Sequence, residues 1–130
     1  MILDTNILVA LLKGDPAAAR AITSLEEEED ARIATTVVTA YELLKGAYVS
    51  CRPKENLAKV QSVISNIQVL ELSLSACVEA SKIYRDLRKA GTLIGEFDIL
   101  IAAIARACDE TIMTRDGHFS FIRVIKVIGW

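Results

Sequence analysis

Residues 1–6 of the chain read MILDTN. Ile2 and Leu3 predict a very short buried strand, and the apolar run at residues 7–12 predicts a helix directly after it. Asp4 lies between these two elements, where its side chain could cap the helix. The carboxyl end of a strand is also the place where open α/β sheets bind their ligands. The first residues therefore leave two roles open for Asp4, a helix cap or an active-site acid.

The composition predicts a chain with a well-filled aliphatic core. The 130 residues are 52% hydrophobic and 25% charged, which suits one domain spanning residues 1–130. No apolar run approaches the ~20 residues of a membrane-spanning helix, and Asp4 interrupts the only candidate for a secretory leader. We therefore expect a cytoplasmic protein that does not enter a membrane.

Neither the cysteines nor the net charge points to a function. Cys51, Cys77 and Cys108 have no metal-type spacing and predict reduced thiols. Cys77 and Cys108 lie in apolar-periodic stretches, so we expect them to fill the core. The formal net charge of −2 excludes binding of nucleic acid through bulk basicity. Contact with nucleic acid would need local patches or bound metal.

Short strand-like runs alternate with longer helical ones along the chain. We expect strands at residues 1–4, 32–35, 67–72, 111–114 and 124–127, and helices at 6–13, 16–29, 36–50, 53–65, 73–90 and 96–108. This order predicts an α/β fold in which helices cover both faces of a central parallel sheet of four to five short strands. Catalytic groups should then lie at the carboxyl ends of the strands and on the first turns of the helices.

Four acids fit that placement. Asp4 and Asp116 each follow a predicted strand, whereas Asp98 lies in the first turn of an apolar helix. Glu42 lies early in the helix after the second strand and can reach the same end of the sheet. Taken singly, each acid has a structural alternative as a helix cap, a surface-edge acid or a turn former.

Several carboxylates in one pocket repel one another unless a cation joins them. Oxygen ligands without a histidine or cysteine partner suit Mg²⁺ or Mn²⁺. Such ions polarise phosphate oxygens and lower the pKa of an attacking water. The predicted chemistry is therefore metal-assisted hydrolysis of phosphodiester bonds.

The same residues resemble the four motif regions of PIN domains, and most closely those of the small VapC-type toxins of prokaryotic toxin–antitoxin pairs. The motifs occur in order over essentially the whole chain, as Asp4-Thr5-Asn6, Glu42, Asp98 to Ala103 and Thr114 to Phe119. The resemblance implies a Rossmann-like sheet and an Mg²⁺- or Mn²⁺-dependent ribonuclease that cuts RNA. It also implies metal ligation by Asp4, Glu42, Asp98 and Asp116, with Asn6 and Thr114 as supporting hydrogen-bonding residues.

Two further residues are candidates for accessory roles. Glu96 precedes Asp98 by two positions, so on a helix the two side chains point roughly 200° apart. Arg115 adjoins Asp116 and could contact a phosphate. His118, the only histidine, has no partner that its spacing reveals, and we interpret it as a loop residue. The acidic run at residues 26–30 reads as a solvated turn, because the carboxyl end of a helix disfavours negative charge.

The resemblance also implies partners. Toxins of this type are held inactive by a cognate antitoxin, which lays a helix along a groove near the site, and they often form homodimers. Five apolar residues of the early helices could line such a groove or fill the core instead: Leu8, Leu11, Leu12, Leu43 and Tyr48.

Two other functions remain as alternatives. A phosphatase of the haloacid dehalogenase type would place a second aspartate where this chain has Asn6, and it would need a lysine motif that is not evident. A PIN-like module could also bind RNA or a partner without cutting it. The presence of all four acids argues against that second alternative.

Overall fold

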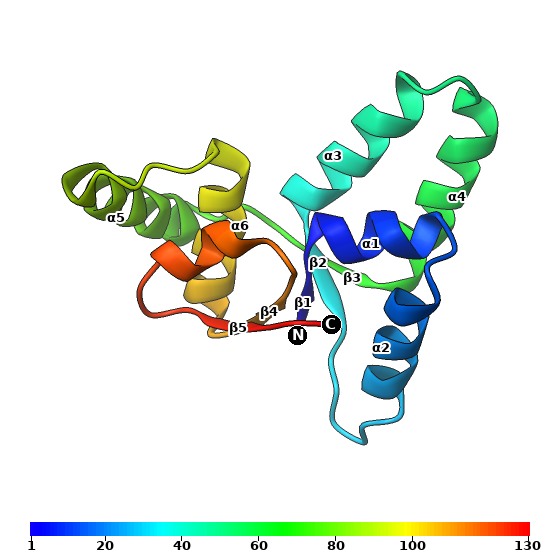
Figure 1. The fold of residues 1–130 in the computed structure, drawn as a ribbon, viewed down its shortest axis with the longest axis horizontal. Coiled ribbons are helices and arrows are strands. Elements are labelled where there is room, and N and C mark those ends of the chain that lie inside the picture. Colours follow the sequence, from blue (N-terminus) through cyan, green and yellow to red (C-terminus); the bar gives the residue numbers. More distant parts are fainter.

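The computed structural model describes residues 1–130, which form one five-stranded sheet with six α-helices packed around it (Figure 1). The strands are all parallel, in the order β3-β2-β1-β4-β5. This arrangement confirms the predicted α/β fold. In chain order the elements are β1 (Ile2–Leu3), α1 (Thr5–Leu12), α2 (Pro16–Glu26), β2 (Ala34–Thr36), α3 (Val37–Tyr48), α4 (Pro53–Asn66), β3 (Gln68–Leu70), α5 (Leu74–Ala90), α6 (Glu96–Cys108), β4 (Thr111–Met113), the 3-10 helix η1 (Gly117–Phe121) and β5 (Lys126–Ile128).

Strands β1 and β4 each supply one residue to each of two hydrophobic cores. Ile2 and Ile112 pack with α5 and α6, whereas Leu3 and Met113 pack with α1 to α4. Consecutive side chains of a strand point to opposite faces of the sheet, so each two-residue apolar step serves both layers. Figure 1 shows the result, with α5 and α6 on one side of the sheet and α1 to α4 on the other.

The strand order opens a crevice beside β1. From β1 the chain first adds β2 and β3 on one side, and it later returns to add β4 and β5 on the other. Connections therefore leave the carboxyl ends of β1 and β4 in opposite directions, which leaves room for a ligand between them. Side chains that follow these two strands face that crevice.

Local chemistry explains where several elements end. Gly91 closes α5 in the left-handed conformation, with φ +70°, which glycine adopts without steric cost. The second helix ends at Glu26 rather than at residue 29, and the acidic run forms an exposed turn. The last strand begins at Lys126 rather than at residue 124, because Val124 has a φ of +59° that a strand cannot contain.

The prediction that Cys108 fills the core was wrong. Cys108 is the last residue of α6 and is exposed, like Cys51, whereas Cys77 is half-buried, and all three are free thiols. The apolar period of α6 ends one turn earlier, at Ala105.

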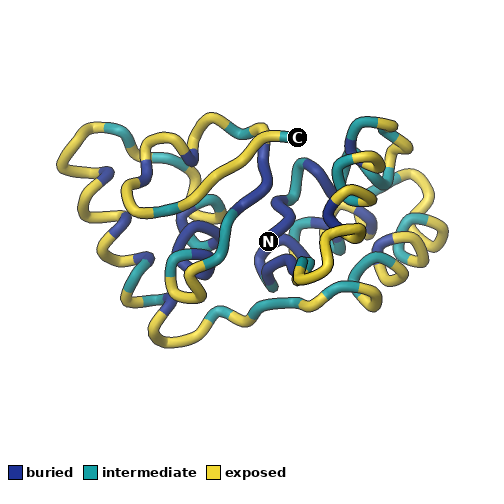
Figure 2. The backbone as a smooth tube through the Cα atoms, turned by 90° about the horizontal axis from the view of Figure 1, so that it is seen from below, coloured by how far each residue is buried: buried dark blue, intermediate teal, exposed yellow.

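None of the helices combines the length and the apolar composition that a membrane crossing needs. Figure 2 shows a largely buried backbone at the N-terminus and an exposed segment that leads to the C-terminus.

Helix α6 packs in the middle of one core, and Ile101 on it is fully buried. We expect Ile101→Ala to lower the free energy of unfolding by about 2–5 kcal/mol, because the vacated volume cannot be refilled by its neighbours. Val78→Ala, on the exposed face of α5, is the matched control and should change stability by less than about 1 kcal/mol. Urea denaturation followed by circular dichroism measures both. Equal effects of the two substitutions would show that α6 is not centrally packed.

Candidate active site

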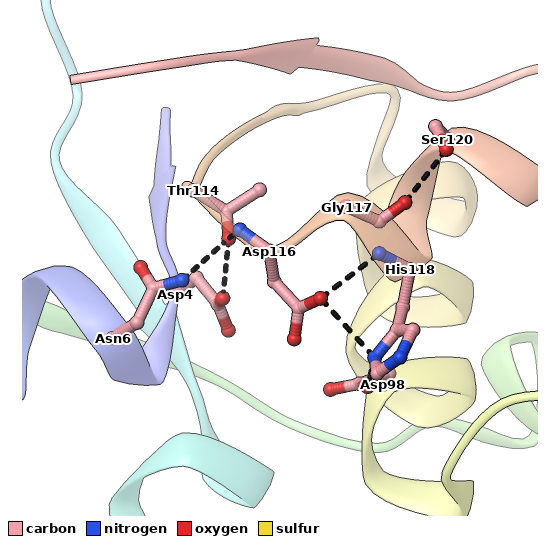
Figure 3. A network of polar contacts seen from close by, with 8 residues as sticks. All are labelled: Asp4, Asn6, Asp98, Thr114, Asp116, Gly117, His118 and Ser120. Carbon is pink, nitrogen blue, oxygen red and sulfur yellow. Dashed lines mark hydrogen bonds and ion pairs between the residues drawn. The ribbon is translucent and has the colours of Figure 1, made fainter.

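The four predicted acids line one cleft of about 740 Å³ at the carboxyl ends of β1 and β4. Asp4 follows β1 and Asp116 follows β4, while Glu42 comes from α3 and Asp98 from the first turn of α6. Four separate elements thus direct a carboxylate to the same place. Figure 3 shows Asp4, Asp98 and Asp116 at this end of the sheet. Lys13 also lines the cleft.

Asp4 is both a helix cap and a cleft acid, so its two predicted roles coincide. Its Oδ1 accepts a hydrogen bond of 2.7 Å from the Thr5 backbone N–H at the start of α1. Its Oδ2 accepts one of 2.6 Å from the Thr114 hydroxyl. A carboxylate oxygen has two lone pairs, so each oxygen keeps one for a ligand. The cap therefore holds the acid in place without consuming it.

Burial dominates the ionisation of Asp4, which is 4% exposed. Burial raises its pKa from 3.8 to about 6, against the lowering effect of the hydrogen bonds from Thr114 and Thr5. The nearby charges of Asp98 and Asp116 contribute a smaller part of the same rise. The fold thus holds Asp4 in an environment that disfavours its negative charge.

A chain of hydrogen bonds that runs from Trp130 through Asn6 and Thr114 holds the Asp4 carboxylate (Figure 3). Each donor and acceptor in this chain can be assigned in only one way. The Trp130 indole N–H can only donate, and it lies 3.3 Å from the Asn6 carbonyl oxygen, so the Asn6 amide points to Thr114, at 2.9 Å. The Asp116 backbone N–H also donates to the Thr114 hydroxyl, at 2.9 Å. Both lone pairs of that hydroxyl are therefore used, and its proton must go to Asp4.

Glu42 is held by a second group of hydroxyls. The Thr5 hydroxyl donates to Glu42 Oε1 at 2.8 Å and lies 3.1 Å from the Thr39 hydroxyl. Thr39 is buried on α3 and contacts the hydroxyl of Thr36, which caps that helix. Thr5 belongs to α1, whereas Thr39 belongs to α3. Their contact across α1 and α3 is tertiary, so spacing in the sequence does not reveal it.

His118 joins the site, contrary to its interpretation as a loop residue without partners. Its Nδ1 lies 3.1 Å from Asp116 Oδ1 and 3.4 Å from Asp98 Oδ2. The backbone N–H of His118 also donates to Asp116 Oδ1 at 2.9 Å, which makes Asp116 the cap of η1. Aspartate side chains commonly accept a hydrogen bond from the backbone N–H two residues later in a turn. This local pattern was the only feature of the sequence that could have placed His118 beside Asp116.

Asp98 also has a raised pKa. Its partial burial is the largest cause, and the charge of Asp116 is the next. The hydrogen bond from His118 lowers the pKa, whereas the charge of Glu42 makes a small contribution that raises it. Asp98, Asp116 and His118 each offer a ligand atom, and these atoms all lie within 4.8 Å of one another. Three side chains are thus close enough to share one ion.

Comparison with known proteins identifies the family. Residues 1–125 match the PIN domain. The chain belongs to the PIN-domain family. A relative from Shigella flexneri, the tRNA(fMet)-specific endonuclease VapC, is 33% identical over 129 residues, which are 98% of this chain and 96% of the relative. Ribonuclease VapC2 from Haemophilus influenzae is 32% identical over 125 residues, 96% of this chain and 92% of the relative.

Solved structures agree in fold over the whole chain. The crystal structure of DNA-bound VapBC from Salmonella typhimurium aligns with a TM-score of 0.90 and 30% identity, covering 99% of this PIN-domain chain and 96% of that chain. VapBC-1 from nontypeable Haemophilus influenzae aligns with a TM-score of 0.89 and 26% identity, with the same coverage.

Two residues predicted as accessory lie outside the cleft of this PIN domain. Glu96 lines a neighbouring hollow instead, on the other side of Asp98. The Arg115 guanidinium lies 3.7 Å from the centre of the Trp130 ring, and its Nε donates to the Trp130 carbonyl oxygen. Arg115 therefore secures the last residue of the chain, which in turn orients Asn6.

The donor set of the cleft fits a divalent cation. No lysine or arginine forms an ion pair with any of the four acids, although Lys13 lines the cleft, and His118 is the only basic side chain paired with them. Carboxylate oxygens that converge without a fixed counter-charge repel one another, and hard oxygen ligands are those that Mg²⁺ and Mn²⁺ prefer. Asp98 and Asp116 lie close enough together to share such an ion with the His118 imidazole, and Asp4 and Glu42 line the same cleft.

The raised pKa of Asp4 predicts a pH-dependent gain in stability for Asp4→Asn in chelator. The folded state binds this proton more tightly than the unfolded state, so the wild type loses stability as pH rises from 3.8 to about 6. The variant lacks that loss. We expect its stability relative to the wild type to rise by at most about 3 kcal/mol between about pH 4 and about pH 7.5. Denaturation at both pH values measures it, and a pH-independent difference would contradict the burial of a charged Asp4.

The hydrogen-bond chain predicts coupling between Trp130 and Asn6. Trp130→Phe removes the indole N–H but keeps a ring for Arg115 to pack on. We expect a loss of about 1 kcal/mol in the free energy of unfolding, and we expect this loss to vanish in an Asn6→Ala background. Urea denaturation of the double-mutant cycle by circular dichroism measures the coupling. Additive losses would show that Trp130 contributes by packing alone.

Proposed function

We propose that this PIN-domain chain, as a single domain over residues 1–130, is a metal-dependent endoribonuclease and the toxin of a toxin–antitoxin pair. The observation that carries the proposal is the convergence of four carboxylates from four elements on one cleft without a lysine or arginine partner. VapC relatives named as ribonucleases and endonucleases, at 32–33% identity over nearly the whole chain, support it. We place the protein in the cytoplasm.

Each acid would serve as a ligand in an orientation that the fold sets beforehand. Thr5 and Thr114 hold Asp4 with one lone pair free on each oxygen, and the Thr5 hydroxyl orients Glu42. Because these hydrogen bonds exist before substrate arrives, little reorganisation is needed when the phosphate enters. A bound Mg²⁺ or Mn²⁺ would neutralise charge on the phosphate oxygens and increase the acidity of the attacking water.

Other residues of the cleft would act on the substrate. Lys13 lines the cleft and can contact a phosphate of the RNA backbone as a point charge. His118 lies beside Asp98 and Asp116 with its side chain 58% exposed, so one edge of the ring remains open to a substrate group. Asn6 and Thr114 would remain supporting residues, because their polar atoms are occupied with Asp4 and Trp130.

The proposed antitoxin would bind beside the cleft. A groove of about 290 Å³ between α1, α3 and α4 is lined by apolar residues that include Leu12 and Leu43, and by the polar residues Lys13, Glu42, Asn56 and Lys59. Of the other residues expected there, Leu8 is in the core, Leu11 is half-buried and Tyr48 is exposed. VapBC complexes such as the one from Salmonella typhimurium support an antitoxin partner for this chain. A homodimer remains part of the proposal through the resemblance to VapC-type toxins.

The proposed activity predicts a specific pattern in a cleavage assay. Purified protein should cut single-stranded RNA with Mg²⁺ or Mn²⁺ and lose this activity on chelation. Asp98→Asn should lower the cleavage rate by roughly a hundredfold or more. Replacing a residue that only hydrogen-bonds to a metal ligand already lowers metal affinity or activity by roughly 10–100-fold. Asp109→Asn, an exposed acid paired with Lys126 away from the cleft, is the matched control and should keep full activity. Gel analysis of labelled RNA measures all three proteins.

Two outcomes would contradict this function. Cleavage that persists in chelator, or full activity of Asp98→Asn, would show that the nuclease is a contaminant or that the acids are structural. RNA binding without cleavage at any metal concentration would instead favour a catalytically silent PIN-like module.

A further inference from the structure

A second hollow adjoins the cleft across two of its acids. It measures about 350 Å³ and is lined by Glu42, Gly95, Glu96, Phe97 and Asp98. Glu42 and Asp98 line the main cleft as well. The two acids therefore form a shared rim, and a polymer whose phosphate rests on that rim would extend into a cavity on each side.

An exposed aromatic pair borders this hollow. Phe97 is 36% exposed and Tyr41 is 53% exposed, and neither belongs to a hydrophobic core. Their ring centres lie 5.6 Å apart in an edge-to-face arrangement, with an interplanar angle of 82°. In the chain, Phe97 directly precedes Asp98 and Tyr41 directly precedes Glu42. The same two helices thus carry both the acids and the aromatic surface next to them.

Two charged side chains that form no ion pair accompany the rings. Lys45 Nζ lies 5.2 Å from the centre of each ring, and it forms no ion pair. Glu96 lines the hollow, and its carboxylate has neither an ion pair nor a hydrogen bond in the protein. The hollow therefore offers a stacking surface, a free cation and a free hydrogen-bond acceptor.

We propose that this hollow is a nucleobase subsite, which holds the base next to the scissile phosphate of a single-stranded RNA. The proposal rests on the nuclease function proposed above and specifies its substrate. Proteins bind unpaired bases by stacking them on aromatic rings beside basic groups that contact the backbone. Phe97 and Tyr41 supply the stacking surface, and Lys45 supplies the basic group.

Glu96 gives the subsite a preference among bases. A carboxylate can only accept hydrogen bonds, so it favours a base with an exocyclic amino group over uracil, whose one base donor, N3–H, lies between two carbonyl oxygens that repel the carboxylate. Cytosine and uracil are of similar size, and the group at ring position 4 distinguishes them, an amino group in cytosine and a carbonyl oxygen in uracil. The subsite therefore binds cytosine more tightly than uracil. A second copy of this chain is a poorer occupant, since it would bury the charges of Glu96 and Lys45 without partners.

Equilibrium binding of two labelled homopolymers tests the stacking surface. Fluorescein-labelled oligocytidylate and oligouridylate of roughly 12 nucleotides are titrated by anisotropy with Ca²⁺, an ion that also takes oxygen ligands. We expect Phe97→Leu, which keeps apolar bulk but removes the ring, to weaken binding of both by roughly five- to tenfold. Phe121→Leu, an exposed aromatic on η1, is the control and should bind like the wild type. Unchanged affinity in Phe97→Leu, or no binding of oligocytidylate by the wild type, overturns the proposal.

Base preference tests Glu96 independently of folding. The wild type should bind oligocytidylate about fivefold or more tightly than oligouridylate. In Glu96→Gln the amide can both donate and accept, so this ratio should fall towards one. Glu27→Gln, in the exposed turn after α2, is the control and should keep the ratio. A general loss of protein stability would weaken the binding of both polymers equally and leave the ratio of their affinities unchanged. An unchanged ratio in Glu96→Gln overturns the assignment of base preference to Glu96.

Two further measurements separate this proposal from others. Cleavage assays on wild type and Asp98→Asn report on the nuclease function alone, because the anisotropy titration needs no turnover. If cleavage is confirmed while Phe97→Leu binds normally, only the subsite fails. Light scattering checks the assembly state, and a dimer that dissociates in Phe97→Leu with unchanged RNA affinity per chain would show that this face joins two copies instead.

Discussion

The hydrogen bond from the Thr114 hydroxyl to Asp4 Oδ2 joins the carboxyl ends of the two central strands, and the site is built around it. Its donor is buried, and both of its lone pairs are occupied by Asn6 and by the Asp116 backbone. The bond can therefore form in only one direction. Since Asp4 also caps α1, the same contact sets the orientation of a helix, a strand end and a carboxylate together.

The position of the acids opposes stability, and the surrounding packing compensates for it. Desolvation raises the pKa of Asp4 and of Asp98, so each charge costs free energy in the protein without a cation. The two hydrophobic cores on either side of the sheet make this cost tolerable. Strained or unfavourable placement of polar groups is expected where a ligand later relieves it, and far from such sites the chain follows ordinary rules of capping and packing.

The sequence predicted the sheet and all four acids because both follow from local patterns. Apolar runs define the strands, and an acid directly after a strand must lie at its carboxyl end. The roles of His118 and Trp130 were not predictable in this way. Trp130 contacts Asn6, 124 positions away in the chain, and His118 reaches Asp98 only because η1 folds over the start of α6. The hollow beside Phe97 likewise needs two helices to be placed together before it exists.

The short edge strand β5 leads to Trp130 at the site. This strand pairs with a neighbour on one side only, where it contacts β4. Its residues are exposed, and its ladder with β4 extends to the bond from the Thr114 backbone N–H to the Ile128 carbonyl. Amides in such a strand exchange with solvent through local opening that leaves the rest of the fold intact. Each opening releases Trp130 and frees Asn6 to rotate. The orientation of the Asn6 amide is therefore coupled to the pairing of β5 with β4.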